Sequence, residues 1–127
     1  IKPEIDSHIN GLKSDIEKLN EKLRTVNGEI DNLDPLLEDH KKAIEEVRQE
    51  MNKKANEGRM YSHVEYGTWE AEQKYKSAHP EYVKTKAEYD ELKERKEKLL
   101  RRIERRERFL GILIKCKKRI AKYINVA

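Results

Sequence analysis

Apolar residues recur at alternating spacings of four and three over the first 51 residues of the chain. His40 occupies the one polar position of this first repeat, and between Ile5 and Met51 only Leu36 and Ala43 are apolar off it. The apolar members of the first repeat are Ile5, Ile9, Leu12, Ile16, Leu19, Leu23, Val26, Ile30, Leu33, Leu37, Ile44, Val47 and Met51. Such a narrow stripe is typical of a helix that packs against one other helix. We therefore predict a first long helix over residues 4–55.

A second repeat with the same alternation lies in the carboxy-terminal part of the chain, and it includes three cations. Its members are Tyr89, Leu92, Lys96, Leu99, Ile103, Arg106, Leu110, Leu113, Lys117, Ile120 and Ile124. The alternation predicts a second long helix over residues 80–125.

The periodicity is lost over residues 56–67, where two glycines indicate a connection between helices. After this connection, Thr68 is expected to cap a short helix over residues 68–79, which ends before Pro80.

Folding the chain at the connection pairs the two repeats, because their lengths match. Paired residue numbers would sum to about 129, so that Ile5 meets Ile124 and Met51 meets Ala78. A parallel homodimer of the second helix would instead place each of its three stripe cations against its own copy. We therefore predict an all-α fold, in which residues 1–127 form a single elongated antiparallel coiled-coil helical hairpin.

Composition agrees with long exposed helices: 43% of the residues are charged and 35% are hydrophobic. Cys116 is the only cysteine, which excludes a disulfide framework. No apolar run approaches the roughly 18 residues that a membrane span needs. Because the chain begins with Ile1, we interpret it as a fragment of a larger protein. We expect it to be intracellular and soluble, in the cytoplasm or the nucleus.

Aromatic residues concentrate around the predicted connection: five of the eight lie between Tyr61 and Tyr82. Tyr, Trp and Met are enriched at the centres of protein interfaces. We refer to residues 59–75 as the aromatic segment and predict that it forms a partner-binding tip of the hairpin. The residues expected to contact a partner are Met60, Tyr61, Tyr66, Trp69 and Tyr75. The alternative is a local cluster that closes the hairpin.

Positive charge concentrates between residues 93 and 122, which hold 14 Lys or Arg against 4 Asp or Glu. The predicted basic surface consists of Arg101, Arg102, Arg105, Arg108, Lys115, Lys118 and Arg119. One interpretation is a solvated helix face with intramolecular ion pairs. The other is a binding surface for a polyanion, either nucleic acid or an anionic membrane surface.

The same helix carries the apolar residues Phe109, Ile112 and Ile114 off its heptad positions. A two-helix hairpin does not cover them, so we predict that they form an oligomer interface joining two hairpins in a four-helix arrangement. A heterologous partner helix and an anionic membrane surface are the alternatives.

Catalytic motifs are absent from the sequence: it has no glycine-rich phosphate loop, no Cys or His pairs at metal-ligand spacing and no nucleophile elbow. We predict neither an enzyme nor a bound cofactor or metal. His40 is interpreted as a polar heptad position that sets register, with a pH-sensitive point or a ligand shared between dimers as alternatives. The predicted function is a non-catalytic protein interaction or assembly module that forms a homodimer and binds protein partners. Polyanion binding is the alternative.

One stretch resembles a known family. The run Lys76-Ser77-Ala78-His79-Pro80-Glu81-Tyr82, with the heptad residues after it, is similar to the last helix of the occludin and ELL-type carboxy-terminal coiled-coil domain. The resemblance covers about a quarter of the chain and implies a coiled-coil helix. This chain has a tyrosine where that family commonly has a cysteine, and it continues beyond the point where that domain ends, so no binding residue is carried over.

Overall fold

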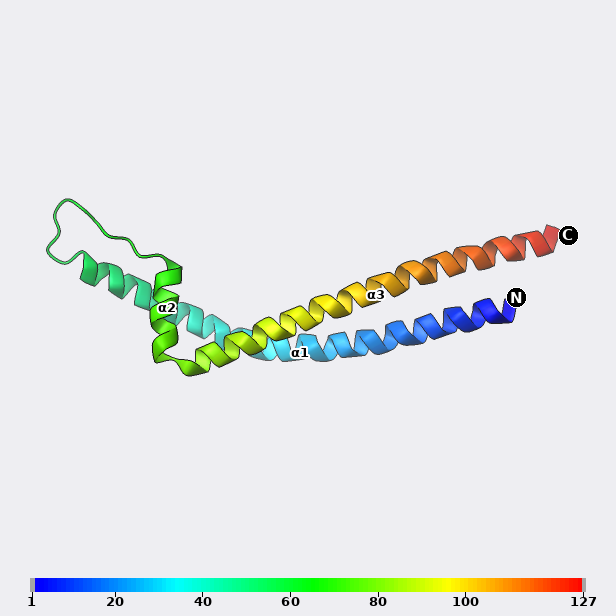
Figure 1. Cartoon of the computed structure of the whole chain (residues 1–127), viewed down its shortest axis with the longest axis horizontal. Coiled ribbons are helices and arrows are strands. Elements are labelled where there is room, and N and C mark those ends of the chain that lie inside the picture. Colours follow the sequence, from blue (N-terminus) through cyan, green and yellow to red (C-terminus); the bar gives the residue numbers. More distant parts are fainter. Residues whose placement is uncertain (1, 127) are drawn as a thin grey trace. The chain divides into compact units, whose positions relative to one another are not determined.

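The structure, a computed structural model, describes the backbone of residues 2–126 and the side chains of residues 3–124. It contains three helices, α1 (Lys2–Ala55), α2 (Thr68–Ala78) and α3 (Pro80–Val126), and no strand in the described range (Figure 1). The all-α prediction is confirmed, and each helix begins and ends within two residues of its predicted bounds.

Contacts divide the chain into two compact units. The terminal unit consists of residues 1–28 and 93–127, and the middle unit consists of residues 29–92. In the terminal unit, α1 and α3 run antiparallel (Figure 1). Its buried residues all come from heptad positions: Ile9, Leu19, Val26, Leu99 and Ile103. The predicted periodicity therefore selects the buried face of both helices.

The register of the terminal unit differs from the predicted one. The Asp6 carboxylate pairs with the Lys117 ammonium at 2.5 Å, so these facing residue numbers sum to 123 rather than about 129. Ile124, which was expected to meet Ile5, is 61% exposed. The period of the repeat does not distinguish these two alignments, because shifting one helix along the other keeps the apolar stripes in contact.

In the middle unit, the second half of α1 packs with α2 and the first quarter of α3. The core contains Ile44, Ala71, Tyr75 and Tyr82, against which Leu37, Ala43, Val47 and Met51 are partly buried. Ala78 is exposed, so the predicted pairing of Met51 with Ala78 is wrong. The chain breaks at His79, as the predicted short helix over residues 68–79 requires, and helix α2 crosses α1, a direction that the pairing of the two repeats did not include (Figure 1).

The narrow stripe of α1 is confirmed. Every position of the first repeat is buried or half-buried, including His40, whereas Leu36 beside the stripe is exposed. Across the described residues, no helix carries an apolar stretch sufficient to cross a membrane.

Candidate protein-binding site

The connection between α1 and α2 begins with a tight turn. Asn56 and Glu57 continue the hydrogen bonding of α1, and the Arg59 N–H donates to the Asn56 carbonyl at 3.1 Å. Gly58 lies within this turn with a φ angle of +74°, a left-handed backbone conformation that is unfavourable for residues with a Cβ atom. The turn directs the following residues away from the helix end.

Large apolar side chains are exposed within this connection and directly after it. Tyr61 is 94% exposed, Met60 81% and Trp69 69%. Tyr66 is half-buried. Three of the five residues predicted to bind a partner are thus largely accessible in the middle unit.

The returning part of the loop is held against α1 by two asparagines. The Asn56 side chain accepts a hydrogen bond from the Val64 N–H at 2.7 Å and donates to the Val64 carbonyl at 2.9 Å. In the same way, the Asn52 side chain accepts a hydrogen bond from the Tyr66 N–H at 2.6 Å and donates one to the Tyr66 carbonyl at 3.4 Å. We name these four hydrogen bonds the asparagine clamp.

Simple geometry explains why the asparagine clamp fits. Four residues of helix advance about 6 Å, and two residues of extended chain advance about 6.6 Å. Asn52 and Asn56 are therefore spaced to bind alternate residues of an extended segment, and they bind Val64 and Tyr66. Because each amide satisfies both backbone groups of one residue, the segment needs no second strand to remain extended.

Helix α2 begins directly after the clamped segment. Gly67 is its N-cap, and the Glu70 carboxylate accepts a hydrogen bond from the Gly67 N–H at 2.9 Å. Thr68, predicted to be the cap, is instead the first helical residue. This start places Trp69 in the first turn of α2, where its ring remains exposed.

Tyr75 belongs to the core rather than to the accessible surface, which corrects its predicted place in the binding tip. It is 5% exposed, and its hydroxyl shares a 2.6 Å hydrogen bond with His40 Nδ1. Its ring stacks on His79 with centroids 3.9 Å apart and meets Tyr82 edge-on at 5.4 Å. The tyrosine lies on the face of α2 that packs toward α1.

His40 therefore links α1 to α2 and α3. Besides its hydrogen bond to Tyr75, its ring lies 5.1 Å from that of Tyr82. Burial raises the pKa of both tyrosine hydroxyls. The negative charge of Glu81 raises the pKa of Tyr75 further. For Tyr82 the main carboxylate is Glu72, which accepts a hydrogen bond from the Tyr82 hydroxyl at 3.4 Å and raises the pKa of that hydroxyl.

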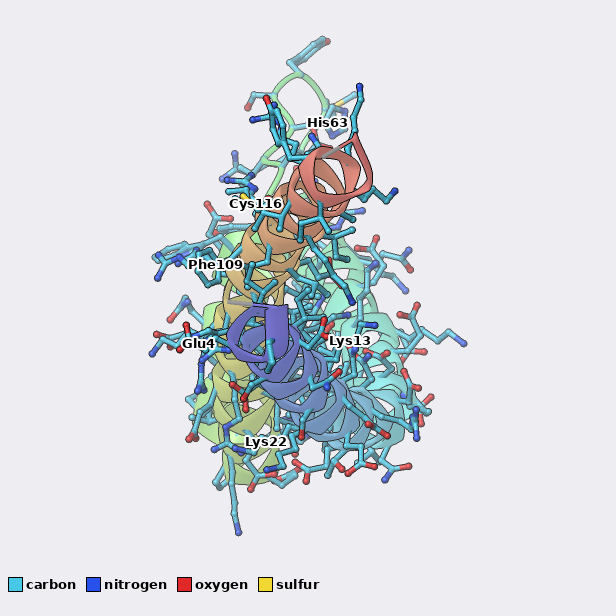
Figure 2. All side chains as sticks on the ribbon, turned by 90° about the vertical axis from the view of Figure 1, so that its right-hand side faces the viewer. Glu4, Lys13, Lys22, His63, Phe109 and Cys116 are labelled. Atoms are coloured by element: carbon cyan, nitrogen blue, oxygen red, sulfur yellow. The ribbon has the colours of Figure 1, made fainter. Side chains whose placement is uncertain are left out.

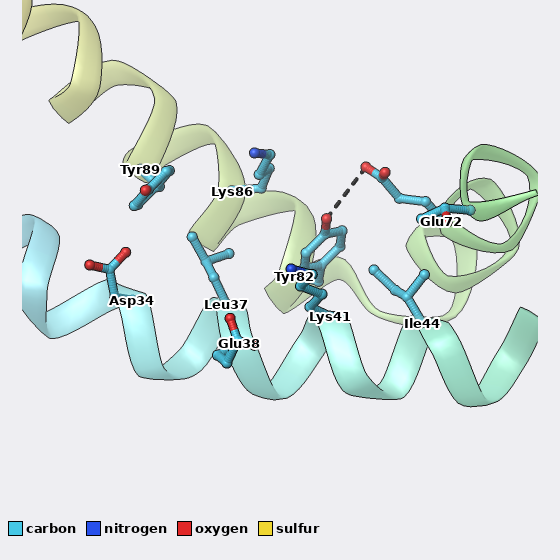
Figure 3. A pocket seen from close by; sticks show the side chains of 10 residues that line it. Asp34, Leu37, Glu38, Lys41, Ile44, Glu72, Tyr82, Lys86 and Tyr89 are labelled. Atoms are coloured by element: carbon cyan, nitrogen blue, oxygen red, sulfur yellow. Dashed lines mark hydrogen bonds between the residues drawn. The ribbon is translucent and has the colours of Figure 1, made fainter.

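An open pocket of about 330 Å³ lies beside this cluster (Figure 3). Its apolar wall is formed by Leu37, Ile44, Tyr82 and Tyr89. The charged residues that line it are Asp34, Glu38, Lys41, Glu72 and Lys86. Lys86 forms an ion pair with Asp90 at 3.3 Å and Glu72 one with Lys76 at 3.2 Å, so much of this charge is already balanced within the protein.

The terminal unit carries the other predicted surfaces. Phe109 is exposed (Figure 2). Ile112 is exposed as well, while Ile114 is half-buried and less available to a partner. All seven residues of the predicted basic surface are exposed. Within the described residues, ion pairs engage only two of the seven, Arg101 with Glu97 at 3.8 Å and Arg108 with Glu104 at 2.5 Å.

Sequence reasoning missed the asparagine clamp and the hydrogen bond between His40 and Tyr75. The clamp has a recognisable signal, since Asn52 and Asn56 lie four residues apart where the first repeat ends. They precede a short run with β-type residues, Val64 and Tyr66. The bond from His40 to Tyr75 has no such signal, because it depends on where α2 crosses α1.

The described residues contain no group of three or more His, Cys, Asp or Glu side chains arranged to hold a metal ion. Comparisons of the chain with protein-family models, curated proteins and solved structures find no match. The case for a function therefore rests on the residues described above.

Proposed function

We propose that this protein is a non-catalytic interaction module that binds a protein partner through its aromatic segment. The observation that carries the proposal is the exposure of Met60, Tyr61 and Trp69 around one connection. Tyr and Trp supply large contact areas with few rotamers to order, which is why they dominate the energetics of many interfaces.

The rings contribute little to the fold in their exposed positions. Tyr61 and Trp69 are absent from the core of the middle unit, which is built from Ile44 and residues of α2 and α3. A connection between two helices can be made from small polar residues at low conformational cost. The presence of large exposed apolar residues there supports a role in binding.

The loop is also ordered before any partner arrives. The asparagine clamp fixes the backbone of Val64 and Tyr66, and Glu70 fixes that of Gly67. Ordering a residue on binding costs about 1–2 kcal/mol of backbone entropy, so a preordered segment binds more tightly.

We propose further that α1 and α3 form a coiled-coil hairpin and that Phe109, Ile112 and Ile114 join two copies. The heptad stripe and the antiparallel pairing within the terminal unit support the hairpin. The exposed apolar side chains of Phe109 and Ile112 support the contact between copies.

Partner capture from a native extract tests the proposed function. The double variant Tyr61→Ser with Trp69→Ser should lose the retained partner while keeping the helicity and melting temperature of the parent. Leu36→Ser is the matched control, because Leu36 is an exposed apolar residue outside the aromatic segment. Equal capture by the double variant and the control would reject the proposal.

Polyanion binding remains the second candidate, favoured by one observation. Five of the seven residues of the basic surface lie outside every ion pair that the described residues form. Phosphate contacts weaken steeply as salt rises. A nonspecific oligonucleotide should therefore bind at low salt and dissociate at high salt, whereas no binding at low salt would reject this candidate.

A further inference from the structure

The clamped loop segment uses only one of its two hydrogen-bonding edges. In an extended chain, the N–H and C=O groups of successive residues point to opposite sides. The groups of Val64 and Tyr66 face the asparagines of α1. His63 and Glu65 alternate with Val64 and Tyr66 in sequence, so their backbone N–H and C=O groups point away from the asparagines of α1.

This second edge is unpaired. No hydrogen bond engages the backbone of His63 or Glu65 in the part of the chain that the structure describes. Both side chains are exposed, whereas Val64 and Tyr66 are half-buried, which matches the alternation of an extended segment. Figure 2 labels His63 on this loop.

We propose that residues 62–65 form a strand edge that binds an extended peptide segment of the partner protein by β-strand addition. The proposal rests on the interaction function above and names its mode. The backbone of His63 and Glu65 would exchange N–H and C=O hydrogen bonds with the peptide. Met60 and Tyr61, in the bend just before this segment, would pack against the side chains of the peptide.

Backbone complementarity identifies the ligand as an extended peptide. Unpaired N–H and C=O groups in alternation along an edge match another extended backbone better than a helix, whose own groups are internally bonded. The asparagine clamp removes most of the ordering penalty that an unsupported loop would suffer on strand addition. The partner segment must lack proline at the residues facing His63 and Glu65, because proline has no N–H to donate.

A pair of substitutions at one residue separates backbone recognition from side-chain recognition. Glu65→Pro removes the outward N–H and restricts Val64 to the extended conformation that it already has. Glu65→Ala removes the side chain and keeps the N–H. The probe is a phage-displayed library of random heptapeptides, selected on the immobilised full chain.

The selected peptides should bind Glu65→Pro about tenfold or more weakly than the parent, and Glu65→Ala within about twofold. Amide hydrogen exchange at His63 and Glu65 should slow when the peptide binds. Exchange at Val64 and Tyr66 in the unbound Glu65→Pro variant checks that the asparagine clamp survives. If the clamp is lost there, His63→Pro against His63→Ala replaces the pair, and the same two affinities are required.

Three results would overturn the proposal. The first is that the library yields no peptide that binds the chain better than it binds an unrelated control protein. The second is that the proline and alanine variants bind the selected peptides equally well. The third is that the edge pairs with a second copy of this chain, which would be seen as self-association of the parent that Glu65→Pro abolishes. These outcomes are distinct from failure of the proposed function. A partner that needs Tyr61 and Trp69 but tolerates Glu65→Pro leaves that function standing and rejects strand addition alone.

Discussion

Replacing Asn56 with alanine tests whether the asparagine clamp holds the loop. The substitution removes two hydrogen bonds to Val64, at 2.7 and 2.9 Å, and a third from the Asn56 amide to the Asn52 carbonyl at 2.8 Å. Each hydrogen bond contributes about 0.5–1.5 kcal/mol net. Because this net figure already allows for water that replaces a lost partner, we expect the two bonds to Val64 to account for about 1–3 kcal/mol of local stability.

That range predicts exchange of the Val64 amide with solvent about five- to 150-fold faster in Asn56→Ala than in the parent. Native-state hydrogen exchange followed by NMR measures it directly. The melting temperature should change little, because the helix cores do not include Asn56 and alanine favours helix slightly more than asparagine.

Asn32→Ala is the matched control, since Asn32 is exposed on the same helix and forms no side-chain hydrogen bond among the described residues. In Asn32→Ala, the Val64 amide should exchange with solvent at the same rate as in the parent. Unchanged exchange of the Val64 amide in Asn56→Ala would refute the clamp and, with it, the preordered strand edge.

Three further predictions concern the core and the terminal unit. Tyr75→Phe removes the hydrogen bond to His40 and should lower the free energy of unfolding in urea by about 0.5–1.5 kcal/mol; an unchanged midpoint would contradict the role of that bond. Because burial raises the pKa of Tyr75 and Tyr82, the folded state holds these protons more tightly than the unfolded state. Its stability should be full below about pH 10 and fall as pH rises further, and a melting temperature independent of alkaline pH would be inconsistent with burial. Ile112→Glu with Phe109→Glu should convert dimers to monomers in sedimentation without loss of helicity, whereas a monomeric parent at high concentration would rule out self-association.

The helical fold was predictable because the heptad repeat records which face of each helix is buried. Every position of the first repeat is buried or half-buried, as expected. Register was not predictable, because the period repeats along the chain and several alignments bury equivalent residues. The Asp6 to Lys117 pair is a contact between residues far apart in sequence, which the period of the repeat does not predict.

The candidate site was predictable in composition but not in detail. Met60, Tyr61 and Trp69 are exposed as a binding surface requires, whereas Tyr75 is buried because α2 turns that face toward α1. The direction of a short helix depends on its cap and on the residues it meets, and neither follows from periodicity. The asparagine clamp escaped notice because asparagine near a helix end usually indicates only a turn.

Hydrogen exchange on the complex with the captured partner tests the central claim most directly. The account predicts that amides within residues 60–69 exchange more slowly in the complex than in the free chain. Amides within residues 101–119, which contain the basic surface, should be unaffected. Slower exchange confined to residues 101–119 would contradict the account and place binding on α3.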